Sequence, residues 1–437
     1  GTNTINLTGG TNTVITGVNN DTITASSGNN TVDAGEGVNT ITLSGGNNSV
    51  VAGSGSDVFT LSSGTNIVNA GDGINTVTLS NGTNTVTTGI GADTITASSG
   101  TNSINAGDGI DIITLSGGAN TVRSGADGDS ITATSGTNSI DGGAGTNTIS
   151  LSGGTNAVVT GVDNDTITAS SGNNTVDAGD GVNTITLSGG SNSVVAGAGN
   201  DDFTLSSGTN IVNAGNGTNT VTLNGGTNTI SAGTGADTIT ASSGTNSINA
   251  GDGIDIITLN GGANTVNAQA GADSIIANAG TNVINAGEDN NTITLNAGAN
   301  TLTAGSGADS ITSVSGTNVI STGDGSDAII LNGGANTVSA QAGTDSVTIN
   351  SGTNSVDGGD GNDTIVINAG TNTVRGGAGA DTITASGGVN FIDGGADNDS
   401  LSAGFDSITI AGGDGNDVIV IGQGTTVDPV GAGSIDG

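Results

Sequence analysis

The chain has 437 residues, of which 83 are Gly, and its 39 acidic and 2 basic residues give a formal net charge of −37. It contains no Cys and no His, which excludes disulfides and metal sites or catalysis based on those side chains. Arg123 and Arg375 are the only basic residues, too few for a surface that binds phosphates or nucleic acid. No apolar run is long enough for a membrane-spanning helix. The first residues do not form a charged-then-apolar leader, so we expect any export signal to have been removed already or to lie outside this segment.

A nine-residue repeat organises the sequence from residue 1. Position 1 of each nonapeptide is nearly always Gly, position 3 is Asn or Asp, and position 5 is Ile or Val with few exceptions. Positions 4 and 6 are mostly Thr, Ser or Asn. The frame runs without insertion over residues 1–396. We expect residues 397–426 to continue the array with a register slip, and residues 427–437 to form an irregular tail.

The repeat predicts one short strand and one turn in each nonapeptide. Positions 4 to 7 alternate between polar and apolar residues, as a strand with one buried face does. Positions 8 and 9 and positions 1 to 3 are rich in Gly, Asn, Asp and Ser, which favour turns. A four-residue strand cannot bury its apolar side chains alone, whereas stacked repeats can. The sequence therefore predicts an all-β parallel solenoid with 18-residue coils of two nonapeptides, about 24 coils in total.

Alternate turns of this solenoid form an edge of Asn residues. Position 3 is Asn at every eighteenth residue from Asn12 to Asn390, which makes 22 Asn without a substitution. We expect a ladder in which stacked amide side chains bond to one another and to the turn backbone.

The other turns are acidic. One series lies at position 3 and recurs every 36 residues: Asp21, Asp57, Asp93, Asp129, Asp165, Asp201, Asp237, Asp273, Asp309, Asp345 and Asp381. A second series lies at position 9: Glu36, Asp72, Asp108, Asp180, Asp252, Glu288, Asp324 and Asp360. Stacked carboxylates repel unless they are neutralised, and two Arg cannot neutralise them. Ca²⁺, which prefers carboxylate and carbonyl oxygens, is the expected counter-charge along this edge.

The acidic turns resemble the RTX, or haemolysin-type, nonapeptide GGxGxDxUx. Upstream turns read AGSGSD (52–57) and AGTGAD (232–237), whereas the C-terminal ones read GGDGND (358–363), GGAGAD (376–381), GGADND (394–399) and GGDGND (412–417). The resemblance implies a parallel β-roll that binds Ca²⁺, and it adds Asp363, Asp399, Asp414 and Asp417 to the candidate ligands. The Asn-edge turns, such as LSGGTN, depart from the family pattern, so we expect ions on the acidic edge alone.

Two further patterns concern regularity and surface. Residues 26–53 recur almost unchanged as 170–197, an offset of 144 residues, which suggests duplication of a block in an array whose regularity matters. Strands such as Thr22-Ile23-Thr24 and Thr94-Ile95-Thr96 present outward Thr-x-Thr pairs. Thr has a high β-propensity, which explains them structurally, but flat Thr arrays also resemble the ice-binding faces of antifreeze solenoids.

Three classes of function are open. The leading prediction is a bacterial extracellular structural protein, stabilised by Ca²⁺ and self-assembling: a filament, a surface layer or an adhesin rod. A second is a surface that binds ice or a cell-surface glycan. A third is the RTX segment of a larger secreted toxin or enzyme. We expect no catalysis within the chain, because its carboxylates are spread along an edge instead of gathering in a pocket. We also expect no nucleic-acid partner and no membrane insertion.

Overall fold

The structure is a computed structural model that describes residues 1–404 and 408–422. Two compact units divide the chain, Gly1–Asn216 and Gly217–Gly437. Within the described residues both units consist of β-strands and turns without a helix, so no helix there is long and apolar enough to cross a membrane. The tail predicted at 427–437 lies outside the described residues.

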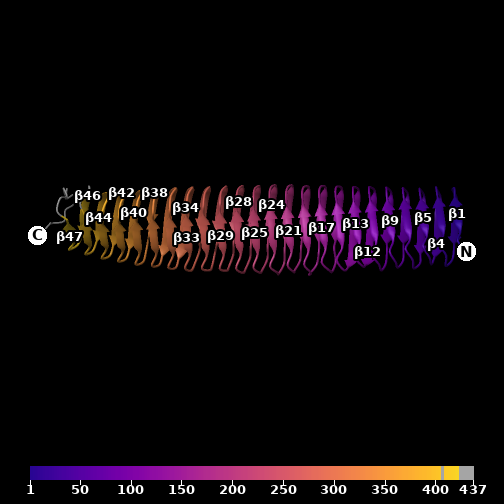
Figure 1. Ribbon diagram of the computed structural model, residues 1–437, viewed down its shortest axis with the longest axis horizontal. Coiled ribbons are helices and arrows are strands. Elements are labelled where there is room, and N and C mark those ends of the chain that lie inside the picture. Colours follow the sequence, from indigo (N-terminus) through magenta and orange to yellow (C-terminus); the bar gives the residue numbers. More distant parts are fainter. Residues whose placement is uncertain (405–407, 423–437) are drawn as a thin grey trace. The chain divides into compact units, whose positions relative to one another are not determined.

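In each unit the strands form two parallel sheets, sheet A from the odd-numbered strands and sheet B from the even-numbered ones (Figure 1). Sheet A of the first unit contains β1 (Thr4–Leu7), β3 (Thr22–Ala25), β5 (Thr40–Leu43), β7 (Val58–Leu61), β9 (Thr76–Leu79), β11 (Thr94–Ala97), β13 (Ile112–Leu115), β15 (Ser130–Ala133), β17 (Thr148–Leu151), β19 (Thr166–Ala169), β21 (Thr184–Leu187) and β23 (Asp202–Leu205). Sheet B of this unit contains β2 (Thr11–Ile15), β4 (Asn29–Gly35), β6 (Asn47–Ala52), β8 (Thr65–Asn69), β10 (Thr83–Thr87), β12 (Thr101–Asp108), β14 (Ala119–Ala126), β16 (Thr137–Asp141), β18 (Thr155–Val159), β20 (Asn173–Asp177), β22 (Ser191–Val195) and β24 (Thr209–Asn213).

The second unit repeats this arrangement. Its sheet A contains β25 (Thr220–Leu223), β27 (Thr238–Ala241), β29 (Ile256–Leu259), β31 (Ser274–Ala277), β33 (Thr292–Leu295), β35 (Ser310–Ser313), β37 (Ala328–Leu331), β39 (Ser346–Ile349), β41 (Thr364–Ile367), β43 (Thr382–Ala385), β45 (Ser400–Ala403) and β47 (Val418–Ile421). Its sheet B contains β26 (Thr227–Ser231), β28 (Thr245–Asn249), β30 (Ala263–Asn267), β32 (Thr281–Asn285), β34 (Ala299–Ser306), β36 (Thr317–Asp324), β38 (Ala335–Ser339), β40 (Thr353–Asp360), β42 (Thr371–Ala378), β44 (Val389–Ala396) and β46 (Ile408–Asp414).

Neighbouring strands pair in parallel, and the partners of each residue lie one coil before it and one coil after it. Thr22 lies opposite Thr4 and Thr40 in sheet A, and Asn30 lies opposite Asn12 and Asn48 in sheet B. Each coil therefore contributes one strand to each sheet and stacks at about 4.8 Å on the next. The predicted parallel β-solenoid with 18-residue coils is confirmed, and the described residues of the two units form about 23 such coils.

The core lies between the two sheets and is thin. In the coil that contains β3 and β4, Ile23, Ala25, Val32 and Ala34 are at most 1% exposed. Their neighbours along each strand point outward, as the period-2 pattern predicts. Because each coil buries only a few aliphatic side chains, hydrogen bonds along the two edges must carry a large part of the cohesion between coils.

The pairing of each strand with the next coil continues past residue 396 in the same register. Asn390 lies opposite Ile408 in sheet B, and Ser400 lies opposite Val418 in sheet A. What changes where the sequence predicted a slip is the residue type, since Ile408 stands in the place that Asn occupies in the preceding coils.

Candidate metal-binding edge

Position 3 of the acidic turns forms a buried column of Asp and Asn side chains in each unit. The backbone N–H of each member donates to Oδ1 of the member one coil later. Near the C-terminus, Asp345, Asp363 and Asp381 donate to Asp363, Asp381 and Asp399 at 2.8, 2.8 and 2.9 Å. Asp363 and Asp381 are 1% exposed. One oxygen of each carboxylate thus has a fixed structural role, which leaves the second oxygen to be accounted for.

The Asn members show what surrounds that second atom. Nδ2 of Asn75 donates to three backbone carbonyl oxygens, those of Gly71 at 3.1 Å, Gly73 at 3.3 Å and Thr88 of the next coil at 3.0 Å. The turn therefore forms a cage of carbonyl oxygens around this position. An amide nitrogen suits such a cage because it carries two N–H donors.

An Asp in the same column places Oδ2 where Asn places Nδ2. In the described part of the chain, the following buried Oδ2 atoms have no hydrogen-bond donor: Asp21, Asp57, Asp93, Asp111, Asp129, Asp165, Asp237, Asp255, Asp273, Asp309, Asp327, Asp345, Asp363, Asp381 and Asp399. An ionised oxygen facing carbonyl oxygens is unfavourable unless a cation or a proton lies between them. The column is thus a row of oxygen cages that need positive charge.

The C-terminal turns also have room for an ion. An ideal Cβ built on Gly376 would lie 2.3 Å from both Asp381 Oδ2 and the carbonyl oxygen of Gly394. On Gly394 the corresponding distances, to Asp399 Oδ2 and Gly412 O, are 2.4 Å. Ca²⁺ binds oxygens at about 2.3–2.6 Å. The residues of these turns therefore fit Ca²⁺, which would be held by the carboxylate and the surrounding carbonyls and would neutralise the column.

The second acidic series differs from the first, because all its members are exposed in the structure. Asp72 and Asp180 accept hydrogen bonds from the backbone N–H of Ile90 and Ala198 in the next coil, at 3.2 and 2.7 Å. Exposed Asp360 and Asp414 occupy the same position near the C-terminus. Among the described residues no three acidic side chains converge on one point, so each candidate site combines carboxylate with backbone carbonyls.

Comparison with known proteins agrees with this geometry. The sequence profile of the RTX calcium-binding nonapeptide repeat matches residues 7–41, 42–77, 78–113, 114–149, 150–185, 159–194, 186–221, 222–257, 258–293, 285–320, 312–347, 348–366, 366–401 and 409–427. The chain belongs to the RTX calcium-binding nonapeptide repeat family. The predicted resemblance is thereby confirmed over the length of the array.

Among the similar solved structures is a hyperactive, Ca²⁺-dependent, β-helical antifreeze protein from an Antarctic bacterium. It is 24% identical, with a TM-score of 0.41, and the alignment covers 55% of this RTX chain and 78% of the antifreeze protein. No curated protein matches the chain significantly.

Burial raises the pKa of the RTX column carboxyls from Asp57 to Asp309 and from Asp345 to Asp399. It raises the pKa of Asp111 and Asp273 to about 7, and that of Asp237 and Asp309 to about 6, from 3.8, with added repulsion from neighbouring carboxylates. Backbone N–H bonds to Oδ1 oppose this effect only in part. The charge of these groups is therefore costly unless a cation balances it.

The opposite edge of the RTX coils is the amide ladder that the sequence predicted. Nδ2 of Asn30 donates to Oδ1 of Asn48 at 2.7 Å, and Nδ2 of Asn48 to Oδ1 of Asn66 at 2.8 Å. Asn48 Nδ2 also bonds to the carbonyl of Gly45 at 3.1 Å. The same bond recurs through each unit, so amide groups supply one another with donors and acceptors. No charge is needed there, and the expectation of an amide ladder is confirmed.

Sequence reasoning missed three members of the buried column. Asp111, Asp255 and Asp327 occupy position 3 in coils where Asn was the usual residue, and each is at most 2% exposed. They fall midway between members of the predicted Asp series and were hidden by its strict spacing. Reading position 3 in every coil, with Asn and Asp taken together, would have found them.

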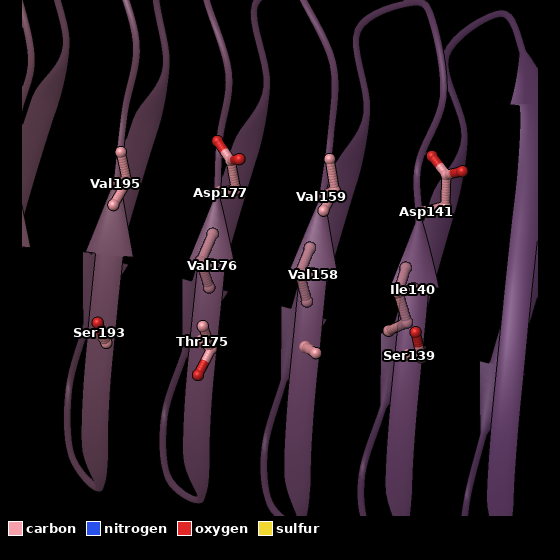
Figure 2. A pocket seen from close by; sticks show the side chains of 11 residues that line it. Ser139, Ile140, Asp141, Val158, Val159, Thr175, Val176, Asp177, Ser193 and Val195 are labelled. Carbon is pink, nitrogen blue, oxygen red and sulfur yellow. The ribbon is translucent and has the colours of Figure 1, made fainter.

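A shallow depression lies on the outer face of sheet B (Figure 2). It is lined by outward side chains that include Asp141, Val159, Asp177 and Val195, in a row along successive strands. Its two carboxylates lie on β16 and β20, with β18 between them. The depression is open, and its carboxylates do not pair in an enclosed pocket.

Proposed function

We propose that this RTX chain is an extracellular structural protein of a bacterium, non-catalytic, stabilised by Ca²⁺ and assembling with further copies into a filament, surface layer or adhesin rod. The observation that carries the proposal is the repetition of the same contacts in coil after coil. Both sheets, the amide ladder and the acidic column repeat every 18 residues within each unit. In such an arrangement most residues serve to repeat the same contacts from coil to coil, as expected for a structural scaffold.

The surface chemistry is compatible with assembly. Sheet B presents rows of Thr, Ser and Asn together with exposed aliphatic side chains, such as Ile67 at 57% and Ile211 at 56% exposed. A net charge of −37 keeps separate copies apart at low ionic strength. Ca²⁺ bridging the exposed acids of the second series would reduce this repulsion and let copies associate.

Electron microscopy and light scattering with millimolar Ca²⁺ or with a chelator test this function. We expect ordered filaments or sheets in Ca²⁺ and separate particles in chelator. A monodisperse monomer at high protein concentration in saturating Ca²⁺ would count against the scaffold.

Ice binding is a second candidate because of one specific feature of sheet A. In the first unit, the second outward position of each strand is Thr in every coil from Thr24 to Thr132, then Ser150, then Thr again from Thr168 to Thr204. The parallel register places these side chains in one straight row with constant spacing. A flat row of hydroxyl and methyl groups is the kind of surface that can order water.

Thermal hysteresis measures this second function directly. Replacing Thr78 and Thr96 by Tyr should abolish hysteresis, whereas replacing Thr83 and Thr85 on sheet B should leave it unchanged. Absence of hysteresis in the unmodified protein would remove this candidate. The third candidate, an RTX segment of a larger secreted toxin or enzyme, is tested by reading the sequence that flanks this chain in its gene.

A further inference from the structure

The residue five positions before each Asp of the column is here called the gate position. It is Gly in the C-terminal turns (Gly358, Gly376, Gly394 and Gly412). Before the upstream aspartates it is Ala at positions 52, 106, 196, 232, 250, 268, 304 and 340, and a hydroxyl residue at Thr16, Thr88, Ser124, Thr160 and Thr322. The C-terminal Gly gates and the upstream gates differ in what fills the gate position and in the oxygen atoms that remain free beside it.

At a Gly gate the space for a side chain coincides with the space for an ion. The ideal Cβ of Gly358 would lie 2.3 Å from the carbonyl oxygen of Gly376 and 2.5 Å from Asp363 Oδ2. The same two kinds of oxygen surround the Cβ positions of Gly376 and Gly394. A methyl group there would touch both oxygens well inside van der Waals distance. Carbon and Ca²⁺ therefore exclude each other at this point.

At an Ala gate the methyl group is present and buried. Ala232 and Ala340 are 0% exposed, as are Ala250, Ala268 and Ala304. Each lies five residues before a buried Asp, as Gly358, Gly376 and Gly394 do. The methyl group fills the part of the cage that an ion would need, although the carboxylate is still there.

At a hydroxyl gate the side chain donates a hydrogen bond to a carbonyl oxygen that could otherwise bind an ion. Thr88 Oγ1 donates to the carbonyl oxygen of Ala106 at 2.7 Å, and Ser124 Oγ donates to that of Gly142 at 2.8 Å. These carbonyls stand in the next coil, in the place that Gly376 O takes for Asp363. The hydroxyl group therefore forms a hydrogen bond with the carbonyl oxygen that would otherwise complete the coordination of the ion.

We propose that the buried column binds Ca²⁺ only in the turns with a Gly gate, from Gly358 onward, and that Ala, Thr or Ser at the gate position closes the upstream turns of the column to the ion. The inference rests on Ca²⁺ binding by the acidic edge, which is part of the proposed function, and it states where along that edge the ions lie. The column itself changes in the same direction. From Asp309 to Asp417 every member is Asp, whereas upstream coils use Asn at Asn39, Asn75 and Asn183.

An Asn in the column fills its cage with N–H donors, so it removes the need for a cation in that coil. Upstream coils thus have two ways of doing without Ca²⁺, an amide or a closed gate. The C-terminal coils have neither. Ions gathered at one end would make the order of those coils depend on Ca²⁺ and leave the upstream coils ordered without it.

The test counts ions per full-length chain by equilibrium dialysis and inductively coupled plasma mass spectrometry. We expect four tightly bound Ca²⁺ in the unmodified protein, one for each of the four Gly gates. G376A should lose one ion, because Gly376 has no left-handed φ and accepts a Cβ in its backbone. G142A is the matched control, since Gly142 stands at the gate of Asn147, 3.3 Å from Nδ2, and no carboxylate is there.

A gain-of-site variant guards against misfolding of G376A. A340G opens the gate in front of Asp345, beside the carbonyl of Gly358, and should add one ion. Hydrogen exchange in chelator should rise in β42–β47 and stay low in the first unit. One ion for every buried Asp, or an unchanged count in both G376A and A340G, would overturn the inference while leaving Ca²⁺ binding intact. No bound ion at all would overturn the inference and the calcium part of the proposed function together.

Discussion

Replacing Asp237 by Asn exchanges a buried acceptor for a donor with almost no change in shape. Oδ1 keeps its role, because it accepts the backbone N–H of Asn219 at 2.7 Å. Oδ2, which has no hydrogen-bond donor, becomes an NH₂ group. By analogy with Asn219, whose Nδ2 bonds to the carbonyl of Ala232 at 3.1 Å, the new amide can donate to the carbonyls of its turn.

The magnitude follows from what is removed and what is gained. An unsatisfied buried acceptor costs about 1–3 kcal/mol, and a new amide–carbonyl bond contributes about 0.5–1.5 kcal/mol net. Ala232 at the gate position leaves no ion to be lost. We expect D237N to raise the free energy of local unfolding of this coil by about 1–3 kcal/mol at pH 7.5, which corresponds to roughly 5–150-fold slower exchange.

Hydrogen exchange of β27 and β29, followed by mass spectrometry in chelator, measures this effect. D252N is the control, because Asp252 is exposed and its loss should change exchange by less than about twofold. At pH 4 the benefit of D237N should shrink, since a protonated carboxyl can also donate. Faster exchange in D237N at pH 7.5 would refute the argument, because it would mean that the ionised carboxylate has a stabilising partner there.

Three further predictions concern the same columns and turns. In chelator the midpoint temperature of thermal unfolding should decrease as the pH is raised from 4 to 8, because burial raises the pKa of Asp273 to about 7 and of Asp237 to about 6 from 3.8. The stability that these carboxyls contribute when protonated is fully present below about pH 4 and is lost as the pH rises through 6–7. A midpoint that rises over this range would contradict the assignment. N120D should lower the free energy of unfolding in urea by about 2–4 kcal/mol. Nδ2 of Asn120 donates to an amide oxygen at 2.7 Å and to a backbone carbonyl at 3.1 Å, and both oxygens would then face a third acceptor. Unchanged stability would show that the amide ladder does not stabilise the fold. G235A should cost about 2–4 kcal/mol, because Gly235 has a φ of +129° and its Cβ would lie 2.1 Å from Gly217 O, and a neutral result by differential scanning calorimetry would contradict the strain.

Much of the fold could be predicted from the nine-residue pattern. The alternation in Thr22-Ile23-Thr24 fixes which side chains face the core, and the Asn series from Asn12 onward implies a ladder as soon as coils stack. Both are consequences of periodicity, which the sequence displays directly. The outcome for the acidic residues was different.

The sequence could not separate the buried acids from the exposed ones. Glu36 and Asp57 both lie in Gly-rich turns, where no period-2 rule says which way a side chain points. The effect of Ala52 on ion binding could not be predicted from the sequence for a similar reason. Its methyl group competes with an ion through space across the turn, a relation that depends on the position of a carbonyl in the neighbouring coil.

The two unlike edges have a consequence for the length of the chain. Amide turns and acidic turns alternate from one nonapeptide to the next, so removal of a single nonapeptide would bring an amide turn onto the acidic column and interrupt both. Removal or insertion of a pair of nonapeptides leaves each edge continuous. The repeated block at 26–53 and 170–197 obeys this, since 144 residues are a whole number of coils. Such an array can change its length in evolution only by whole coils, so the length of the stack changes in steps of about 4.8 Å.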